Sequence, residues 1–244
     1  SFPDPNGTTL WKRTNPQWMV DTRAMLPQAE LYTTALDFTH EPVRRRKLEI
    51  IEEISQRYDV DGFELDYMRH PVLFSRSMRG EPCTAVEVEI ITALMRQIRR
   101  ITEAAAQQRG RPLLIATRTP DSFALGLDHG MDVEAWLRED LVDILIAGGG
   151  YDHLEPWENW AELGERHDVP AYACISASRL KRSRFLDPKS LEATGGWMAK
   201  GHPLFGPIWR GEAANALEAG VSGIYTFNLH DPGENIFWQM GSLE

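Results

Sequence analysis

The chain is short of cysteine, of long apolar runs and of positive charge. Only Cys83 and Cys174 occur among the 244 residues, and their spacing matches no metal-binding or redox motif, so nothing indicates a disulfide. No apolar run approaches the length needed to cross a bilayer. The formal net charge is −10, which makes nucleic acid and anionic membranes poor partners. We therefore expect neither nucleic acid nor a membrane among its partners, and the sequence makes no prediction of the oligomeric state.

The first residues show none of the features of a targeting segment. They contain no signal-peptide pattern and no initiator methionine, and Ser1–Gly7 has the proline-rich, polar composition of a loop. We therefore expect an N-terminal part of the fold to lie upstream of this chain. A secreted or periplasmic protein is compatible with this composition, but no compartment is predicted.

Strand-like and helix-like segments alternate along the chain, which is typical of a parallel sheet covered by helices. No glycine-rich phosphate-binding motif follows any strand, which favours a closed barrel over a doubly wound sheet. We therefore predict a single α/β domain over residues 1–244, a catalytic domain of the (β/α)8 TIM-barrel type. The expected strands are Thr33–Phe38, Val60–Tyr67, Pro112–Thr117, Leu141–Ala147, Pro170–Ile175 and Val221–Phe227. The expected helices begin at Pro42, span Ile91–Ala105 with an end near Gly110, and cover Val133–Arg138, Glu158–Arg166 and Glu212–Ala219.

The second expected strand ends in the densest group of ionisable residues. Glu64 and Asp66 are two positions apart, so in a strand they project from the same face. Active sites of parallel barrels lie at the carboxyl ends of the strands, and two carboxylates there are expected to act on a substrate. The alternative is structural: one of them pairs with Arg69 or caps the following loop.

Polar residues follow each of the six expected strands, as they would at the functional face of a barrel. Eight tryptophans are also present. An open tryptophan ring can stack on a sugar, whereas tryptophans inside amphipathic helices are more simply core residues. We predict the following substrate-binding side chains: Arg69, His70, Arg118, Asp121, His153, Trp157, Asn228 and His230.

Four segments have a recognisable pattern: His40–Arg44, Ile54–Gly62, Val133–Ile146 and Gly7–Trp18. In this order they resemble a helix start, the start of the fourth strand, a later helix–strand element and the loop before the third strand of the glycosyl-hydrolase-like family 10 of TIM-barrel glycosidases. The resemblance implies a glycosidase acting on an oligo- or polysaccharide. It also implies that the six expected strands are strands three to eight of the barrel. The family usually has consecutive acids after its fourth strand, where this chain has Asp66–His70.

The same strand resembles the fourth strand of other barrel glycosidases. In the chitinase-like pattern the terminal catalytic glutamate falls at Met68, so substrate-assisted chemistry is not expected. In the α-amylase pattern Asp66 matches the nucleophile and His70 a sugar-binding histidine, but Glu64 stands in the place of an arginine. Barrels similar to α-galactosidases carry their two acids on strands four and six, which here correspond to Asp66 and Asp152.

Glycoside hydrolysis normally needs two carboxyl groups on either side of the scissile bond. We predict Asp66 as nucleophile or general base, Asp152 as general acid and Glu64 as the substitute for either role, with no cofactor and no metal. Two alternatives remain open. The histidines after the strands could join these acids in a metal-dependent hydrolase or isomerase. The barrel could also bind carbohydrate without catalysis.

Overall fold

The computed structural model describes residues 9–68, 70–148, 155–176, 205–227, 229 and 235–241. The chain divides into two compact units. The first comprises Ser1–Glu64, His70–Ile115 and Phe123–Val142, and the second comprises Leu65–Arg69, Ala116–Ser122 and Asp143–Glu244. No helix among the described residues is both long and apolar enough to cross a membrane.

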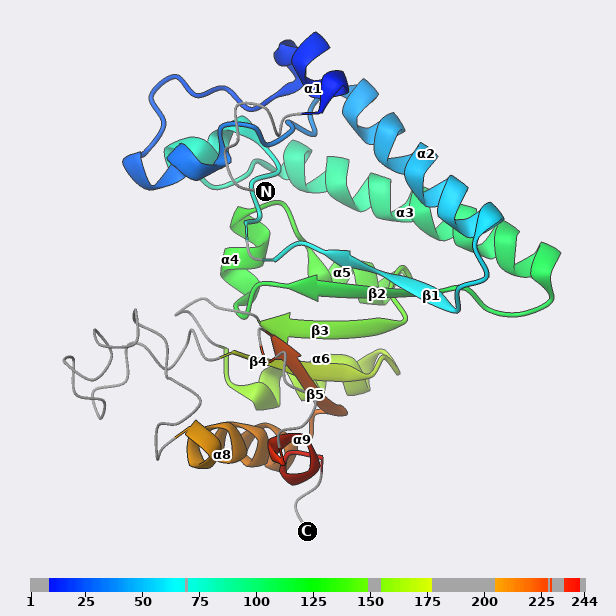
Figure 1. Cartoon of the computed structure of the whole chain (residues 1–244), viewed down its shortest axis with the longest axis vertical. Coiled ribbons are helices and arrows are strands. Elements are labelled where there is room, and N and C mark those ends of the chain that lie inside the picture. The colour runs from blue at the N-terminus through cyan, green and yellow to red at the C-terminus, as the bar shows by residue number, and fades with distance from the viewer. Residues whose placement is uncertain are drawn as a thin grey trace. The chain divides into compact units, whose positions relative to one another are not determined.

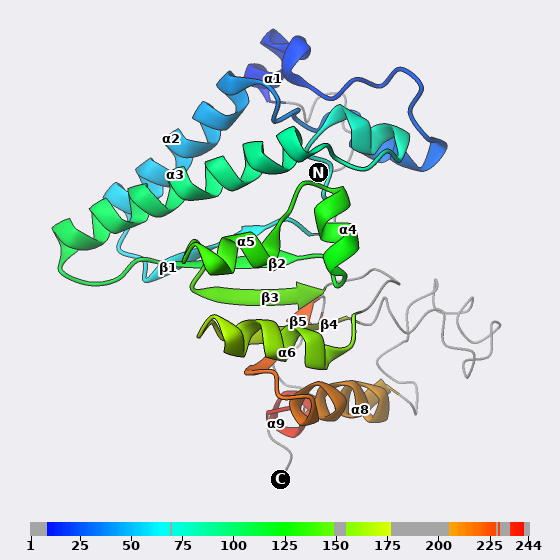
Figure 2. The ribbon, with the colours of Figure 1, turned by 180° about the vertical axis from the view of Figure 1, so that it is seen from behind.

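The first unit is built mainly from helices, and two long ones dominate it. Figures 1 and 2 show α2 (Glu41–Arg57) and α3 (Ala85–Arg109) side by side. A proline in the first turn starts α2, and Thr84 and Glu87 form a reciprocal capping box at the start of α3. The shorter elements of the unit are α1 (Leu10–Thr14), η1 (Pro16–Trp18), η2 (Pro27–Tyr32), η3 (Ser75–Arg79), α4 (Phe123–Asp128) and α5 (Val133–Arg138).

The described strands form a five-stranded sheet in sequential order: β1 (Gly62–Asp66), β2 (Leu114–Thr119), β3 (Ile144–Gly148), β4 (Ala171–Ser176) and β5 (Gly223–Phe227). The pairs β2–β3, β3–β4 and β4–β5 are parallel. A helix stands between each pair of consecutive strands, as parallel connections require. This confirms the predicted α/β alternation and parallel sheet.

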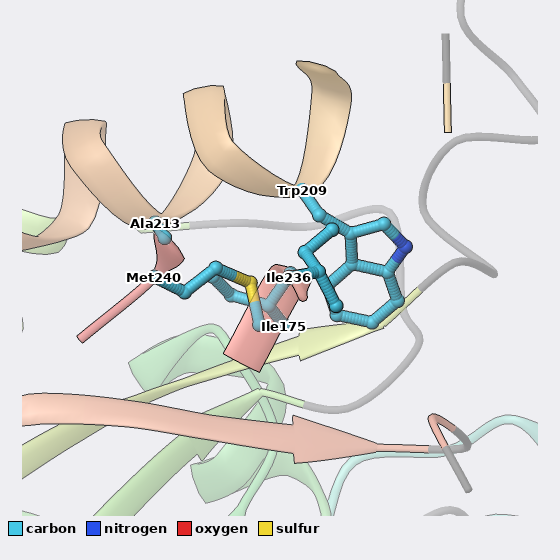
Figure 3. Packing of buried hydrophobic residues seen from close by; sticks show 5 residues of the cluster. All are labelled: Ile175, Trp209, Ala213, Ile236 and Met240. Atoms are coloured by element: carbon cyan, nitrogen blue, oxygen red, sulfur yellow. The ribbon is translucent and has the colours of Figure 1, made fainter. Parts of the chain in front are cut away.

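One face of the second unit's strands is covered by apolar side chains from helices. Ile175 of β4 packs with Trp209 and Ala213 of α8 (Phe205–Glu218) and with Ile236 and Met240 at α9 (Ile236–Gln239), as Figure 3 shows. All five side chains are nearly inaccessible to solvent. Because successive residues of a strand alternate faces, Cys174 and Ser176 lie on the opposite face from this cluster.

The opposite face is concave enough for side chains of distant strands to meet. Arg118 of β2 lies over the rings of Phe227 and Tyr225 of β5, with the guanidinium carbon 4.5 and 5.4 Å from the ring centroids. Two strands separate β2 from β5, so in a flat sheet their backbones would be about 14 Å apart. Their side chains therefore converge across a curved sheet, as they do inside barrels.

One expected strand is wrong. Residues 33–38 contribute only an isolated antiparallel bridge between Met19 and Leu36. The Asp37 carboxylate accepts hydrogen bonds from the backbone N–H and the hydroxyl of Thr39, and these bonds turn the chain towards α2. The other five strands are confirmed, with boundaries that move by up to three residues. The helix expected at Glu212–Ala219 begins earlier, at Phe205.

Candidate functional site

A face rich in polar and aromatic residues lies opposite the apolar cluster. The strand register aligns Arg118 with Ile146, Gly148 with Cys174, Cys174 with Tyr225 and Ser176 with Phe227, so all of these project to the same side. Asp66 joins them because it contacts Arg118. We call this set the polar face: Asp66, Arg118, Cys174, Ser176, Tyr225 and Phe227.

Asp66 at the end of β1 forms a two-pronged ion pair with Arg118. Nε of Arg118 donates to Oδ1 at 2.9 Å, and Nη2 donates to Oδ2 at 2.6 Å. The backbone N–H of Met68 also donates to Oδ1, at 2.9 Å. The two partners differ sharply in burial, because 3% of the Arg118 side chain is exposed but 42% of the Asp66 side chain. The pair therefore presents a carboxylate to solvent and hides its cation.

Arg118 is enclosed on its remaining sides. Its Nη1 lies 3.9 Å from the sulfur of Cys174, and its plane covers Phe227 and Tyr225. Burial disfavours the charged guanidinium and by itself lowers the pKa of Arg118. The hydrogen bonds and charge of Asp66 outweigh this effect, so the pKa of Arg118 lies above its usual value. Arg118, which was predicted to bind substrate, is buried and contacts Asp66 directly.

The segment that follows β1 stays attached to β2. The backbone N–H of Tyr67 donates to the carbonyl of Arg118 at 3.0 Å, and the hydroxyl of Thr117 donates to the carbonyl of Leu65 at 3.3 Å. Burial raises the pKa of the Tyr67 phenol, so Tyr67 is a neutral hydroxyl at ordinary pH. These contacts hold the backbone on both sides of Asp66.

Asp121 follows β2 and is fully buried. Its carbonyl accepts a 2.7 Å hydrogen bond from the N–H of Glu155, just before α6 (Trp157–Arg166). Its Cβ comes close to Gly148, which ends β3 with a φ of +107°. A Cβ at Gly148 would lie 2.9 Å from the carbonyl of Cys174, so only glycine fits there. The structure thus brings Asp121 to the same end of the sheet as Asp66, as expected.

The other predicted residues have different outcomes. Glu64 is exposed and shares the face of Asp66 on β1. His70 lies in the first unit, with its ring 4.7 Å from that of Tyr32. Trp157 is only 1% exposed and its ring is packed in the core; its predicted substrate-binding role stays a prediction. Five predicted residues lie outside the described part of the chain: Arg69, Asp152, His153, Asn228 and His230.

The sequence reasoning did not single out Tyr225, Phe227 or Cys174 as site residues. Tyr225 and Phe227 alternate with Ile224 and Thr226 in the last strand, so the period of two was visible in the sequence. That pattern separates two faces, but it does not identify the face that meets Arg118. Among the described residues, no cluster of three or more His, Cys, Asp or Glu side chains could hold a metal ion.

Comparison with known proteins gives a fold but no family. No family model and no curated protein matches the chain. A glycoside hydrolase family 18 N-acetylglucosaminidase from Paenibacillus barengoltzii aligns over 83% of this chain and 76% of its own, with 12% identity and a TM-score of 0.54. A chitinase from Chromobacterium violaceum aligns over 82% and 71% of the two chains, with 15% identity and a TM-score of 0.48.

No family model thus matches the resemblance to glycosyl-hydrolase-like family 10, and the N-acetylglucosaminidase from Paenibacillus barengoltzii is a family 18 enzyme. At 12% identity the first likeness concerns the fold alone. It agrees with the parallel order of the five strands and with the helices between them. The chain has an α/β fold of the (β/α)8 TIM-barrel type.

Proposed function

We propose that this protein is a glycoside hydrolase that acts on an oligo- or polysaccharide at the carboxyl ends of its parallel strands. The observation that carries the proposal is the Asp66 carboxylate, which is 42% exposed and held by a buried arginine at the end of β1. An ion pair solvated on both sides contributes little to stability, and one buried on both sides is costly to desolvate. Here only the acidic partner faces solvent, at the end of the strands where barrel enzymes act.

Two further features support this function. The polar face places the partly buried rings of Tyr225 and Phe227 beside the ion pair, so aromatic and acidic groups lie together as carbohydrate sites require. The N-acetylglucosaminidase from Paenibacillus barengoltzii shares the fold. The substrate of that enzyme is not carried over to this chain, because Met68 stands where the chitinase-like pattern has its terminal glutamate and its side chain is only 8% exposed.

The two acids have different proposed roles. Asp66 acts as nucleophile or as the base that activates water, and a second carboxyl group protonates the glycosidic oxygen. Asp152 is our first candidate for that acid, whereas Asp121 lies at the same end of the sheet but is fully buried and enters the test as a comparison. A separation of roughly 5–5.5 Å between the two carboxyl groups would give retention, and one of roughly 6.5–9.5 Å would give inversion.

A barrel that binds carbohydrate without cleaving it is the second candidate. The buried Met68 favours it, since the position of a catalytic glutamate in the chitinase-like pattern is filled by an apolar side chain. The metal-dependent alternative involves Asp152, His153 and His230, which lie outside the described part of the chain.

The test compares turnover of aryl glycosides and polysaccharides by the wild type and by Asp66→Asn, Asp152→Asn and Asp121→Asn. We expect Asp66→Asn to lower kcat by at least about 10³-fold, because the amide can neither attack nor accept a proton. The variant that lacks the general acid should regain turnover on substrates whose leaving group needs no protonation. Glu64→Gln should stay within about tenfold of the wild type.

The same panel separates the two candidate functions. A wild type that binds oligosaccharides in calorimetry but cleaves none of them would identify the non-catalytic barrel. Full turnover by Asp66→Asn would contradict the proposed role of this residue, and Glu64→Gln would then show whether the neighbouring acid takes its place.

A further inference from the structure

The hydrogen bonds that Asp66 accepts from residues in the described part of the chain leave one acceptor position open. A carboxylate offers about four lone-pair positions, two on each oxygen. Oδ1 accepts from Nε of Arg118 and from the N–H of Met68, whereas Oδ2 accepts from Nη2 of Arg118 alone. The remaining position therefore lies on Oδ2, on the side away from the guanidinium. The 42% exposure of the Asp66 side chain shows that solvent reaches this carboxylate.

Arg118 is shielded from solvent. Its side chain is 3% exposed, and its contacts with described residues include Asp66, the sulfur of Cys174 and two aromatic rings. A guanidinium is a rigid fork that grips both oxygens of a carboxylate at once, whereas a lysine ammonium contacts a carboxylate as a point charge. The contacts of Arg118 thus set the rotation of the Asp66 carboxylate and decide which lone pair faces outward.

We infer that Arg118 is the positioning residue of Asp66, and that the Oδ2 lone pair directed away from the guanidinium is the position at which Asp66 meets its substrate. This rests on the proposed glycosidase function and deepens it. All three described contacts of Asp66 come from donors, so Asp66 takes the acceptor role, as nucleophile or base, and the proton donor is another residue. The ring of Phe227 supports this arrangement because it lies against the Arg118 guanidinium and limits the tilt of its plane.

The experiment measures kcat and KM separately for Arg118→Lys and for a matched control, Arg111→Lys. Arg111 also bonds two aspartates, Asp59 and Asp61, but it does so at the surface of the first unit. We expect Arg118→Lys to lower kcat about 100-fold or more with KM within about threefold, because misplacing the reacting oxygen affects the transition state and not ground-state binding. Arg111→Lys should keep both values.

Two results would overturn the inference. A wild-type kcat in Arg118→Lys would show that the fork is not needed, and a raised KM with unchanged kcat would show that Arg118 binds substrate directly. Should Arg118→Lys fail to fold, Phe227→Leu replaces it, with an expected fall in kcat of about tenfold, and an unchanged kcat there would count against the arrangement.

A second measurement works without turnover and separates this inference from the proposed function. Urea unfolding of Asp66→Asn, Arg118→Met and the double variant forms a cycle. We compare the fold-changes in the equilibrium constant of unfolding. The fold-change in the double variant should be at least about fivefold smaller than the product of the two single fold-changes. Independent losses would contradict the positioning role. Coupled losses in a protein that cleaves no glycoside would support the Asp66–Arg118 arrangement and contradict the proposed glycosidase function.

Discussion

Asp37 in the first unit and Asp66 in the second are both held by several donors, but the donors differ in kind. Asp37 is 5% exposed and bonds the backbone N–H and hydroxyl groups of Thr39 and Ser75. Asp66 is 42% exposed and bonds a buried cation. Neutral donors that enclose a carboxylate on every side fasten loops together. We propose that a buried cation that leaves one side of the Asp66 carboxylate open holds that carboxylate for contact with a substrate.

Asp61 shows a third arrangement, in which both partners of an ion pair are open to solvent. Asp59 and Asp61 precede β1 and both pair with Arg111, and 37% of the Arg111 side chain and more than nine tenths of each carboxylate side chain are exposed. Asp59 also lies 3.5 Å from Nη2 of Arg109, whose side chain is 17% exposed. Exposed pairs contribute little to stability because water competes for both partners. The exposure of the acid together with that of its cation therefore separates these arrangements.

The largest effect on stability is expected at Asp37. Replacing Asp37 by alanine leaves the donors of Thr39 and Ser75 without their acceptor inside the protein, which should lower the free energy of unfolding by about 3 kcal/mol. Urea unfolding measures this loss. Glycoside turnover by the folded protein should be unchanged, and a selective loss of turnover would place Asp37 in the functional site instead.

The contribution of Asp37 should also depend on pH. Burial raises the pKa of the Asp37 carboxyl, but the hydrogen bonds from Ser75 and Thr39 outweigh it, so the net pKa is lowered. A lowered pKa means that the unfolded chain takes up the proton first as pH falls. The stabilisation is therefore present above about pH 4 and disappears as pH falls through the folded value. The gap between wild type and Asp37→Asn should narrow below about pH 4, and a constant gap would contradict this.

A smaller loss is expected at Asp66. Asp66→Ala leaves the guanidinium of Arg118 buried without its counter-ion, which is costly, but the exposure of Asp66 reduces what the pair contributes in the first place. We expect a loss of about 2 kcal/mol in urea unfolding, together with loss of turnover. A loss larger than that of Asp37→Ala would show that Asp66 is mainly structural and would remove the contrast between the two aspartates.

The smallest effect is expected at the exposed pair. Arg111→Met removes the bonds to Asp59 and Asp61, both of which stay solvated. The urea midpoint should not change measurably, in low salt or in high salt, because solvent already screens these charges. A clear shift of the urea midpoint would show that solvent exposure does not decide how much these ion pairs contribute to stability.

Much of the framework follows from local sequence patterns. The 3.6-residue period and the proline in its first turn predicted α2, and the helix ending near Gly110 appears as α3 with Gly110 in the left-handed region. Five of six strands were predicted from apolar runs. The failure at residues 33–38 has a local cause as well, since the bonds of Asp37 to Thr39 and to Ser75 replace strand pairing.

The sequence by itself determined that Glu64 and Asp66 share a face at the end of a strand, because the period of a strand is two regardless of its surroundings. It could not determine what Asp66 binds. Arg118 lies 52 positions away and Phe227 more than a hundred further on, and only the curvature of the sheet brings them together. Burial was likewise decided by tertiary packing, which encloses Trp157 and Arg118 while it leaves Asp66 open. Contacts between distant strands and the solvent exposure of each side chain depend on the whole fold, whereas periodicity and capping depend on a few neighbouring residues.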